Sequence, residues 1–295
     1  MRFGSVAIEF LPAVQRIVAD GVPDFSRINL VDIVRDVMEI EHIEVIEITM
    51  EMEHMVPGSI TPEVISQLAD LKDEIGHSYT VHLPLWSIEL ATFNDFVRSG
   101  SVESVCHSIK MAEPLEPDAY VLHATGALAA EYTRNNYSEI MNLLVCGYMT
   151  SFAMKSVEEI MSKTEIDPRK LALENVEFPF DFTRDIVDEH GTGICFDTGH
   201  LLTKQSGDES IIDFYRKHRD RIVEVHLNDG IDTRTPGKYE DHLAIGKGEL
   251  PVRDFLLELK KDGFKGPLIF ELTTEEVIES LDEIRKVVPE VLGGL

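Results

Sequence analysis

Histidine and carboxylate side chains recur at the ends of short apolar segments throughout the chain. Six segments each end in a residue that can bind a metal ion or move a proton: His82, His123, Glu174, Asp197, His226 and Glu271. Any one of them alone is explained more simply as a hydrogen-bonded polar residue. Burying such groups among Val, Leu, Ile and Phe costs several kcal/mol unless they are paired or bind a metal. Their repetition at the same place therefore indicates one shared site.

The donor types of this set predict which metal the site would hold. Imidazole nitrogens mixed with carboxylate oxygens suit zinc or manganese, whereas an all-oxygen set favours magnesium or calcium. We therefore expect one to three divalent ions, with zinc or manganese preferred. Cys195 lies two residues before Asp197 on the same face, and a lone thiol of this kind is typical of barrel packing.

The apolar segments predict the framework that carries these residues. Short runs rich in β-branched residues predict strands at residues 5–10, 43–49, 79–83, 119–123, 171–174, 193–197, 222–227 and 268–272. Helical periodicity between them predicts helices at residues 27–41, 61–75, 97–111, 137–161, 180–190, 209–218, 252–262 and 274–288. Eight strand and helix pairs without a break in composition predict one domain, residues 1–295, folded as a single (β/α)8 TIM barrel.

An open doubly wound sheet is the alternative architecture. It would carry a glycine-rich phosphate loop after an early strand, and Gly246-Lys247-Gly248 lies late and predicts a turn instead. In the barrel, the C-terminal ends of the strands converge on one mouth, where active sites of this fold are built. The barrel therefore explains why the chemistry sits at the strand ends.

The composition of the chain limits the classes of molecule that it is expected to bind. The chain has 27 Lys and Arg against 54 Asp and Glu, a formal charge of −27, which disfavours nucleic acid and anionic membranes because both are bound through clustered cations. The three cysteines show no CxxC spacing, which indicates reduced thiols. No signal peptide is indicated, and the longest uncharged run, residues 140–154, is shorter than the roughly 20 residues of a membrane span. We expect a soluble, cytoplasmic protein that acts on a small molecule, with its oligomeric state open.

Several short motifs together resemble a known family. Leu173-Glu174-Asn175, Phe196-Asp197-Thr198-Gly199-His200, Val225-His226-Leu227-Asn228-Asp229, the run from Asp241 to Gly248, and Phe270-Glu271 occur in that order. This ordered combination resembles the xylose isomerase-like TIM-barrel superfamily. That superfamily contains sugar and sugar-phosphate isomerases and epimerases and the endonuclease IV type of AP endonuclease (AP endonuclease family 2).

The resemblance implies residue roles. In the single-metal isomerases and epimerases, positions like Glu174, Asp197, His226 and Glu271 hold one ion, the two glutamates move protons, and the position like His200 contacts substrate. In the endonuclease IV branch, three zinc ions are held by those residues and by positions like His82, His123, His200 and His242, with an acidic residue two before the last. Here that residue is Glu240 where the family usually has Asp, and Asp241 is adjacent, so either could be the ligand.

Three functions follow from these residues. The preferred one is a metal-dependent sugar or sugar-phosphate isomerase or epimerase, in which Glu174 and Glu271 transfer a proton through a metal-stabilised enediolate. The alternative is a multi-metal zinc phosphoesterase acting on a small or cofactor-like phosphoester rather than DNA. A barrel that binds a ligand without activity is the third.

Weaker features concern substrate contacts. Trp86 and Lys247 are predicted to contact a polyhydroxyl or phosphorylated substrate, with a covering aromatic and a solvated lysine as the alternatives. Met50, Met52 and Met55 are predicted as apolar filler, or else as a substrate lid. Glu47 is predicted to orient a ligand histidine.

Overall fold

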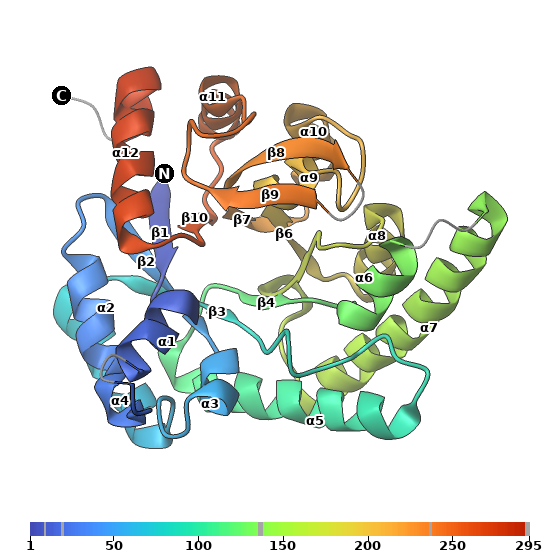
Figure 1. The fold of residues 1–295 in the computed structure, drawn as a ribbon, viewed down its shortest axis with the longest axis horizontal. Coiled ribbons are helices and arrows are strands. Elements are labelled where there is room, and N and C mark those ends of the chain that lie inside the picture. Colours follow the sequence, from blue (N-terminus) through green and yellow to red (C-terminus); the bar gives the residue numbers. More distant parts are fainter. Residues whose placement is uncertain (9, 19–20, 135–137, 236–237, 293–295) are drawn as a thin grey trace.

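Eight parallel strands close into a barrel that forms the centre of the molecule (Figure 1). The computed structural model describes residues 1–8, 10–18, 21–134, 138–235 and 238–292. The barrel strands are β1 (Arg2–Val6), β2 (Ile43–Thr49), β3 (Ser78–His82), β4 (Tyr120–Leu122), β5 (Leu171–Glu174), β6 (Gly193–Asp197), β7 (Ile222–His226) and β10 (Pro267–Phe270). Each strand pairs with its neighbours in sequence order and β10 pairs with β1. The predicted (β/α)8 barrel is confirmed.

Helices surround this barrel (Figure 1). They are α1 (Phe10–Ile17), α2 (Leu30–Met38), α3 (Glu51–Met55), α4 (Pro62–Ile75), α5 (Asp95–Ala112), α6 (Ala127–Arg134), α7 (Glu139–Thr164), α8 (Phe180–His190), α9 (Thr198–Leu202), α10 (Ile211–His218), α11 (Val252–Asp262) and α12 (Thr274–Val287). Short 3-10 turns lie at Phe25–Arg27, Glu113–Leu115, Pro168–Lys170 and Pro289–Val291. The Thr61 side chain accepts a hydrogen bond from Val64 N and so caps α4, while Gly191 and Gly263 end α8 and α11 in the left-handed conformation.

Three predicted elements differ from the structure by three residues or more at one or both ends, and the other bounds differ by at most two. The first strand, predicted at residues 5–10, is β1, because residues 2–5 pair with β10 and the chain from residue 10 onward forms α1. The helix predicted at 27–41 begins later, because Asn29 caps it by accepting from Asp32 N. The helix predicted at 137–161 corresponds to α7, and residue 137 lies outside the described residues.

A further element follows β7. Strands β8 (Asp229–Thr235) and β9 (Lys238–Leu243) form an antiparallel hairpin where the sequence predicted a loop. Alternation is weak in these two segments, which are rich in charged residues, so they carry little strand signal. The hairpin lies beside β7 (Figure 1) and brings Asp241 and His242 toward the barrel.

Alternation along the strands divides the core from the site. On β5, Leu171 and Leu173 belong to the main apolar core that also includes residues of the surrounding helices, whereas Ala172 and Glu174 have the opposite parity. The same holds on β6, where Ile194 and Phe196 join the main core while Cys195 packs with Ala172. Each strand therefore presents its last inward side chain at the C-terminal end of the barrel.

Among the described helices, α7 alone is long and apolar enough to cross a membrane by length and composition. Length and composition are weak evidence of a membrane span, because buried core helices pass the same test. In α7, 33% of the most apolar stretch is buried within the structure. Buried residues along it include Met149, Ala153, Val157 and Ile160. The packing of its C-terminal half is that of a helix in the outer ring of the barrel.

Candidate metal centre

Four side chains form a tight buried group at the C-terminal mouth. Each of them offers one ligand atom within 4.8 Å of the others, and they are Glu174, Asp197, His226 and Glu271. The side chains of Asp197 and His226 are 0% exposed, and that of Glu271 is 16% exposed. They come from β5, β6 and β7 and from the residue after β10, so strand geometry alone brings them together. We call this set the inner group.

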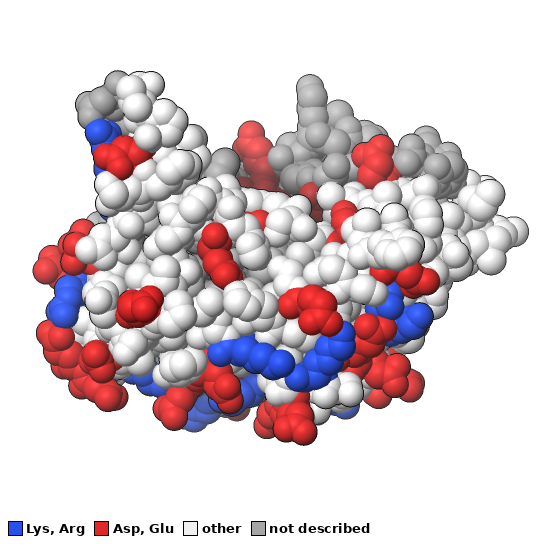
Figure 2. Space-filling model, turned by 90° about the horizontal axis from the view of Figure 1, so that it is seen from below, with Lys and Arg blue, Asp and Glu red and all other residues white. Residues whose placement is uncertain are grey.

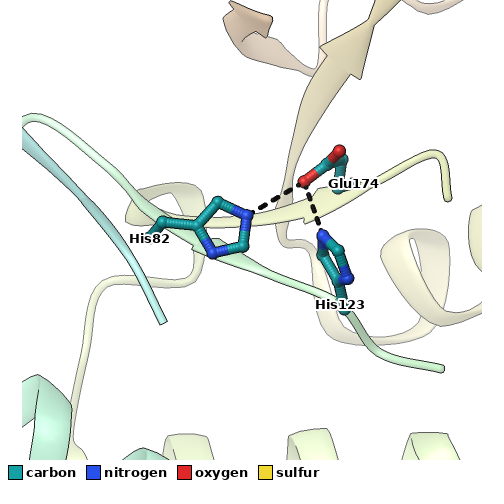
Figure 3. A group of neighbouring side chains, drawn as sticks. All are labelled: His82, His123 and Glu174. Carbon is teal, nitrogen blue, oxygen red and sulfur yellow. Dashed lines mark hydrogen bonds and ion pairs between the residues drawn. The ribbon is translucent and has the colours of Figure 1, made fainter. Parts of the chain in front are cut away.

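Glu174 is the hub of the wider cluster. Its Oε2 lies 2.9 Å from His123 Nε2 and 3.3 Å from His82 Nε2, and both rings point toward this oxygen (Figure 3). Its Oε1 lies 3.2 Å from His200 Nδ1 and 3.6 Å from His226 Nδ1. One carboxylate therefore faces four imidazoles from four different segments of the chain.

An outer group lies next to the inner one and comes from the β8–β9 hairpin. His242 Nε2 is 3.2 Å from Glu271 Oε2, and His242 Nδ1 is 3.2 Å from Asp241 Oδ1. Asp241 Oδ2 also lies 3.9 Å from His200 Nε2. We call Asp241 and His242 the outer group, with His200 between it and the inner group.

The structure separates the two acidic residues before His242. Asp241 lines the cavity of the site, while the Glu240 side chain is exposed and does not belong to the described cavity lining. His242 has a left-handed backbone with φ of 51°, which breaks strand alternation and allows adjacent residues 241 and 242 to face the same side. Of these two acidic residues, Asp241 is therefore the one that lines the described cavity beside His242.

Two buried asparagines hold the inner carboxylates. Asn228 Nδ2 donates to Asp197 Oδ2 at 3.0 Å and to Glu271 Oε2 at 3.3 Å, and its Oδ1 accepts from Glu271 N. Asn175 pairs with the backbone of Asp197 through both its amide groups. The motifs of the sequence contain both residues, but the sequence analysis gave them no role. Their place one residue after β5 and two residues after β7 was the available signal.

Two of the histidines also have fixed ring orientations. The carbonyl oxygen of Leu83 lies 2.9 Å from His82 Nδ1 and can accept a hydrogen bond from it. This contact directs Nε2 of the same ring toward Glu174. His226 Nε2 lies 3.5 Å from the fully buried Glu47, while its Nδ1 faces the inner group. Glu47 therefore lies where it was predicted, beside a candidate ligand histidine.

The glycine-lysine-glycine loop is organised by Asp229. Both Gly246 N and Gly248 N donate to Asp229 Oδ2 at 2.9 Å, and Leu250 N donates to Oδ1 at 2.8 Å. A Cβ at Gly248 would collide with Asp229 and Gly230, so this position requires glycine. Lys247 is exposed, lies outside the described cavity lining and places its ammonium 3.3 Å from Glu279 Oε2.

A cavity of about 500 Å³ opens over the inner group. Its described lining includes His82, His123, His200 and His242 on the polar side and Met52, Met55, Leu85 and Trp86 on the apolar side. Trp86 is 63% exposed, whereas Met50 is fully buried and lies outside the described lining. Lys204 lies outside the described lining, and its Nζ donates to Asp208 O.

Known proteins resemble this chain in sequence and in fold. The family described as xylose isomerase-like TIM barrel matches residues 41–288. The chain belongs to this family. The uncharacterized protein MJ1311 of Methanocaldococcus jannaschii is 27% identical over 223 residues, which cover 72% of this chain and 70% of that protein.

Two solved structures are similar in fold. A D-tagatose 3-epimerase-like protein aligns with a TM-score of 0.72 at 22% identity and covers 99% of this chain and 98% of its own. Endonuclease IV from Thermus thermophilus aligns with a TM-score of 0.63 at 16% identity, over 98% and 100% of the two chains. The xylose isomerase-like family and these neighbours comprise enzymes of two different reaction classes.

Members of the xylose isomerase-like family are typically metal-dependent, and the residues of this chain fit a divalent cation. The inner group combines three carboxylates with one imidazole. The buried His226 Nδ1 and His200 Nδ1 lie within ion-pair distance of carboxylates, but neither makes a contact with hydrogen-bond geometry among the described residues. Four further groups among the described residues could each hold an ion, and two of them contain cavity histidines: His82 with His123 and Glu174, and Asp197 with His200 and His242. This donor chemistry suits zinc or manganese.

The histidines and carboxylates of the site shift one another's pKa values. Burial lowers the pKa of His82, but the hydrogen bond with Glu174 and the nearby Glu47 outweigh it and raise that pKa to about 9. Burial also opposes protonation of His200, and Asp197 and Glu174 raise its pKa to about 9. Burial favours the neutral acid at Glu174 and Glu271, yet the histidines hold both pKa values well below the ordinary range.

Proposed function

We propose that this protein is a divalent-metal-dependent isomerase or epimerase of a small polyhydroxyl compound. The observation that carries the proposal is the position of the two glutamates. Glu271 Oε2 lies 3.0 Å and Glu174 Oε1 3.6 Å from the same nitrogen, His226 Nδ1, beneath a cavity of about 500 Å³. This volume suits one small ligand.

The residues supply the two halves of a proton transfer. When bound by the inner group, a divalent ion supplies Lewis-acid polarisation of a carbonyl. One of the two glutamates takes the proton from the carbon next to that carbonyl and releases it to solvent. The other, protonated from solvent, returns a proton to the substrate, so that no redox cofactor is required. His200, which lines the cavity, is placed to hydrogen-bond a substrate oxygen.

Solvent-proton exchange tests this function directly. We expect manganese-loaded protein in D2O to exchange the hydrogen beside the carbonyl in at least one member of a panel of ketopentoses, ketohexoses and their phosphates. Proton NMR would follow the exchange and the appearance of the epimer or isomer. The Glu271→Gln variant should lower the exchange rate by about 100-fold or more. Glu158→Gln, exposed on α7, is the matched control and should leave it unchanged. An absence of exchange across the whole panel overturns the proposal.

A second function is favoured by the number of ligand clusters. The groups around His82 and His123 and around His200 and His242 exceed what a single ion uses, as expected of a multi-metal phosphoesterase acting on a small phosphoester. Metal content of protein purified without added metal separates the two functions. One equivalent that survives Ala substitution at His82 and His123 supports the isomerase, and two or three equivalents lost on those substitutions support the phosphoesterase.

We also propose a cytoplasmic location. The three cysteines, Cys106, Cys146 and Cys195, are all free thiols buried in the structure. Free buried thiols are typical of a reducing compartment. Alkylation by maleimide in the intact cell and after denaturation would measure their redox state in place.

A further inference from the structure

The first half of helix α7 exposes a concentration of large apolar side chains. Five of the exposed large apolar residues that the structure describes lie within nine consecutive positions of this helix: Ile140 (72%), Met141 (49%), Leu143 (55%), Leu144 (65%) and Tyr148 (57%). We call these five residues the α7 patch. Single exposed apolar residues are ordinary on protein surfaces, whereas a cluster of this kind marks a surface that binds a partner.

Helix α7 is apolar on two opposite faces. The helix packs against α5 and α8, and its buried residues recur every three or four positions: Cys146, Met149, Ala153, Val157 and Ile160. Ile140, Leu144 and Tyr148 recur every four positions and lie on the opposite side, because successive helical residues are about 100° apart around the axis. Helices that are apolar all round are buried on all sides. The second face of α7 is therefore one that a partner covers.

The α7 patch lies in the longest uncharged run of the sequence, residues 140–154, in a chain with a formal charge of −27. In Figure 1 the first half of α7 projects from the barrel at the right-hand end of the long axis. Figure 2 keeps this axis horizontal, and its right-hand tip is white on the face shown, while Asp and Glu side chains lie elsewhere. Two copies of so acidic a protein repel each other over most of their surfaces, and the repulsion is weakest where no charge lies.

Two-fold symmetry would also set opposite charges beside each other at the ends of the patch. In an antiparallel pair of α7 helices that cross between residues 147 and 148, Leu144 of one copy lies beside Ser151 of the other, and Ile140 lies beside Lys155. The exposed Lys155 shares the face of Leu144 and so approaches Glu139, in the first turn of the other helix. A parallel pair would instead set each Lys155 beside its own copy. Charge complementarity therefore favours the antiparallel pair.

The exposed apolar area is that of a dimer interface. At their exposures the five side chains of the α7 patch present about 100 Å² each, or roughly 500 Å² together. Phe93, Phe96 and Val97 are 54%, 93% and 47% exposed at the start of α5, and they add about 300 Å². They lie near α7, because Arg98 of α5 donates to Ser156 Oγ at 3.3 Å. The total of about 800 Å² is what each partner buries in an interface of standard size.

We propose that this protein is a two-fold symmetric homodimer in which the first halves of two α7 helices pack antiparallel through the α7 patch, with the start of α5 at the rim. A membrane is the other surface that covers an apolar helix face, but stable binding to anionic lipid needs clustered cations, and the patch has none. No residue of the patch belongs to the described cavity lining, so the dimer is independent of the proposed reaction.

Sedimentation velocity of the full chain tests the dimer. We expect the native protein to be a dimer at about 50 µM. Leu144→Lys should raise its dissociation constant by about 100-fold or more, because an ammonium loses water against an apolar surface. This change makes the chain less acidic, so a lost dimer cannot come from stronger general repulsion. Ile278→Lys, 46% exposed on α12, is the matched control and should keep the native dissociation constant. Circular dichroism would verify that both variants fold.

Further variants test the antiparallel arrangement. Tyr148→Cys places a thiol beside the two-fold axis and should form a disulfide between copies on oxidation, since the three native cysteines are buried. In the same pair the two copies of residue 140 lie about 22 Å apart, far beyond the roughly 7 Å that a disulfide spans, so Ile140→Cys should not form one. Lys155→Glu should weaken the dimer about tenfold, and Glu139→Lys added to it should restore the native dissociation constant.

Three results overturn the inference: a native monomer at about 100 µM, a dimer that Leu144→Lys leaves unchanged, or a disulfide that forms as readily with Ile140→Cys as with Tyr148→Cys. Flotation with vesicles of phosphatidylcholine and phosphatidylglycerol tests the membrane. A native monomer that floats with these vesicles, and no longer does so after Leu144→Lys, would assign the α7 patch to lipid and also overturn the dimer.

Discussion

The inner and outer groups of the site are built in different ways. Inner residues such as Asp197 and His226 lie on barrel strands and are fully buried, and Asn228 donates a hydrogen bond to Asp197. The outer His242 lies in a hairpin, its side chain is 35% exposed, and its backbone is left-handed. Buried groups on rigid strands hold a fixed geometry, whereas exposed groups on a hairpin can adjust. The comparison predicts that residues of the inner group are required for any metal binding, whereas residues of the outer group affect only how many further metal ions are bound.

The largest effect is expected at Glu174. Glu174→Gln removes the charge that faces four imidazoles, so bound metal should be lost and turnover should fall by about 1000-fold or more. Elemental analysis of the purified variant and the exchange assay would measure the two losses. Asp241→Asn is the control from the outer group and should keep the inner ion. Equal metal loss in both variants would remove the distinction between the two groups.

The second effect is a dependence on pH. Metal affinity should rise with pH, whereas the stability of the metal-free protein should fall with pH. The pKa values of His82 and His200 are raised from 6.5 to about 9 by their carboxylate partners. A metal must displace these protons, so affinity should rise by about tenfold per pH unit for each proton released, up to about pH 9. Chelator competition between pH 6 and 9 would measure the slope.

The stability of the metal-free protein should decrease as the pH rises. A raised pKa means that the folded state binds the protons more tightly than the unfolded chain, so this stabilisation is fully present below pH 6.5. It is lost as the pH rises through about 9. Unfolding temperatures at pH 6.5 and 9 should therefore fall with pH without metal and rise with pH when metal is limiting. A rise in both states would contradict the assigned protonation of His82 and His200.

The third effect tests the brace of the inner group. Asn228→Ala removes the donor shared by Asp197 and Glu271 and the acceptor of Glu271 N. Loss of such an orienting residue costs about 10- to 100-fold in metal affinity, and leaving buried partners unsatisfied costs about 1–3 kcal/mol of stability. Chelator competition and chemical unfolding would measure the two changes. Asn228→Asp keeps the shape but adds a charge beside two carboxylates, so it should not rescue affinity.

The framework of this site could be predicted from sequence because strand periodicity carries most of the information. Once residues such as Glu174 and Asp197 are assigned to strand ends, they must lie close together, because the C-terminal ends of the strands form one face of the barrel. The parity that places Leu173 in the outer core also turns Glu174 inward. Local pattern and tertiary position agree for these residues, so the inner group was accessible from the sequence.

The outer group, Asp241 and His242, could not be predicted from strand periodicity in this way. The hairpin has weak alternation, and the left-handed backbone of His242 shifts the facing residue from Glu240 to Asp241. A backbone angle of this kind has no reliable sequence signal when the residue is not glycine. The carboxylates Glu51 and Asp229 were missed for a related reason, because their partners are backbone amides of segments distant in sequence.

The smallest effect separates the two adjacent acids. Asp241→Asn should weaken metal binding at His200 and His242 by about tenfold, because it removes a negative charge beside both partly exposed histidines. Glu240→Gln is the matched variant, and since its side chain is exposed to solvent it should leave metal content unchanged. Zinc titration with a chromophoric chelator would resolve the weaker equivalent from the inner one. If Glu240→Gln is the variant that loses zinc, the hairpin register is not the one that sets residues 241 and 242 toward the cavity. The outer group would then have to be rebuilt around Glu240, while the inner group, held by the strands, would stay as it is.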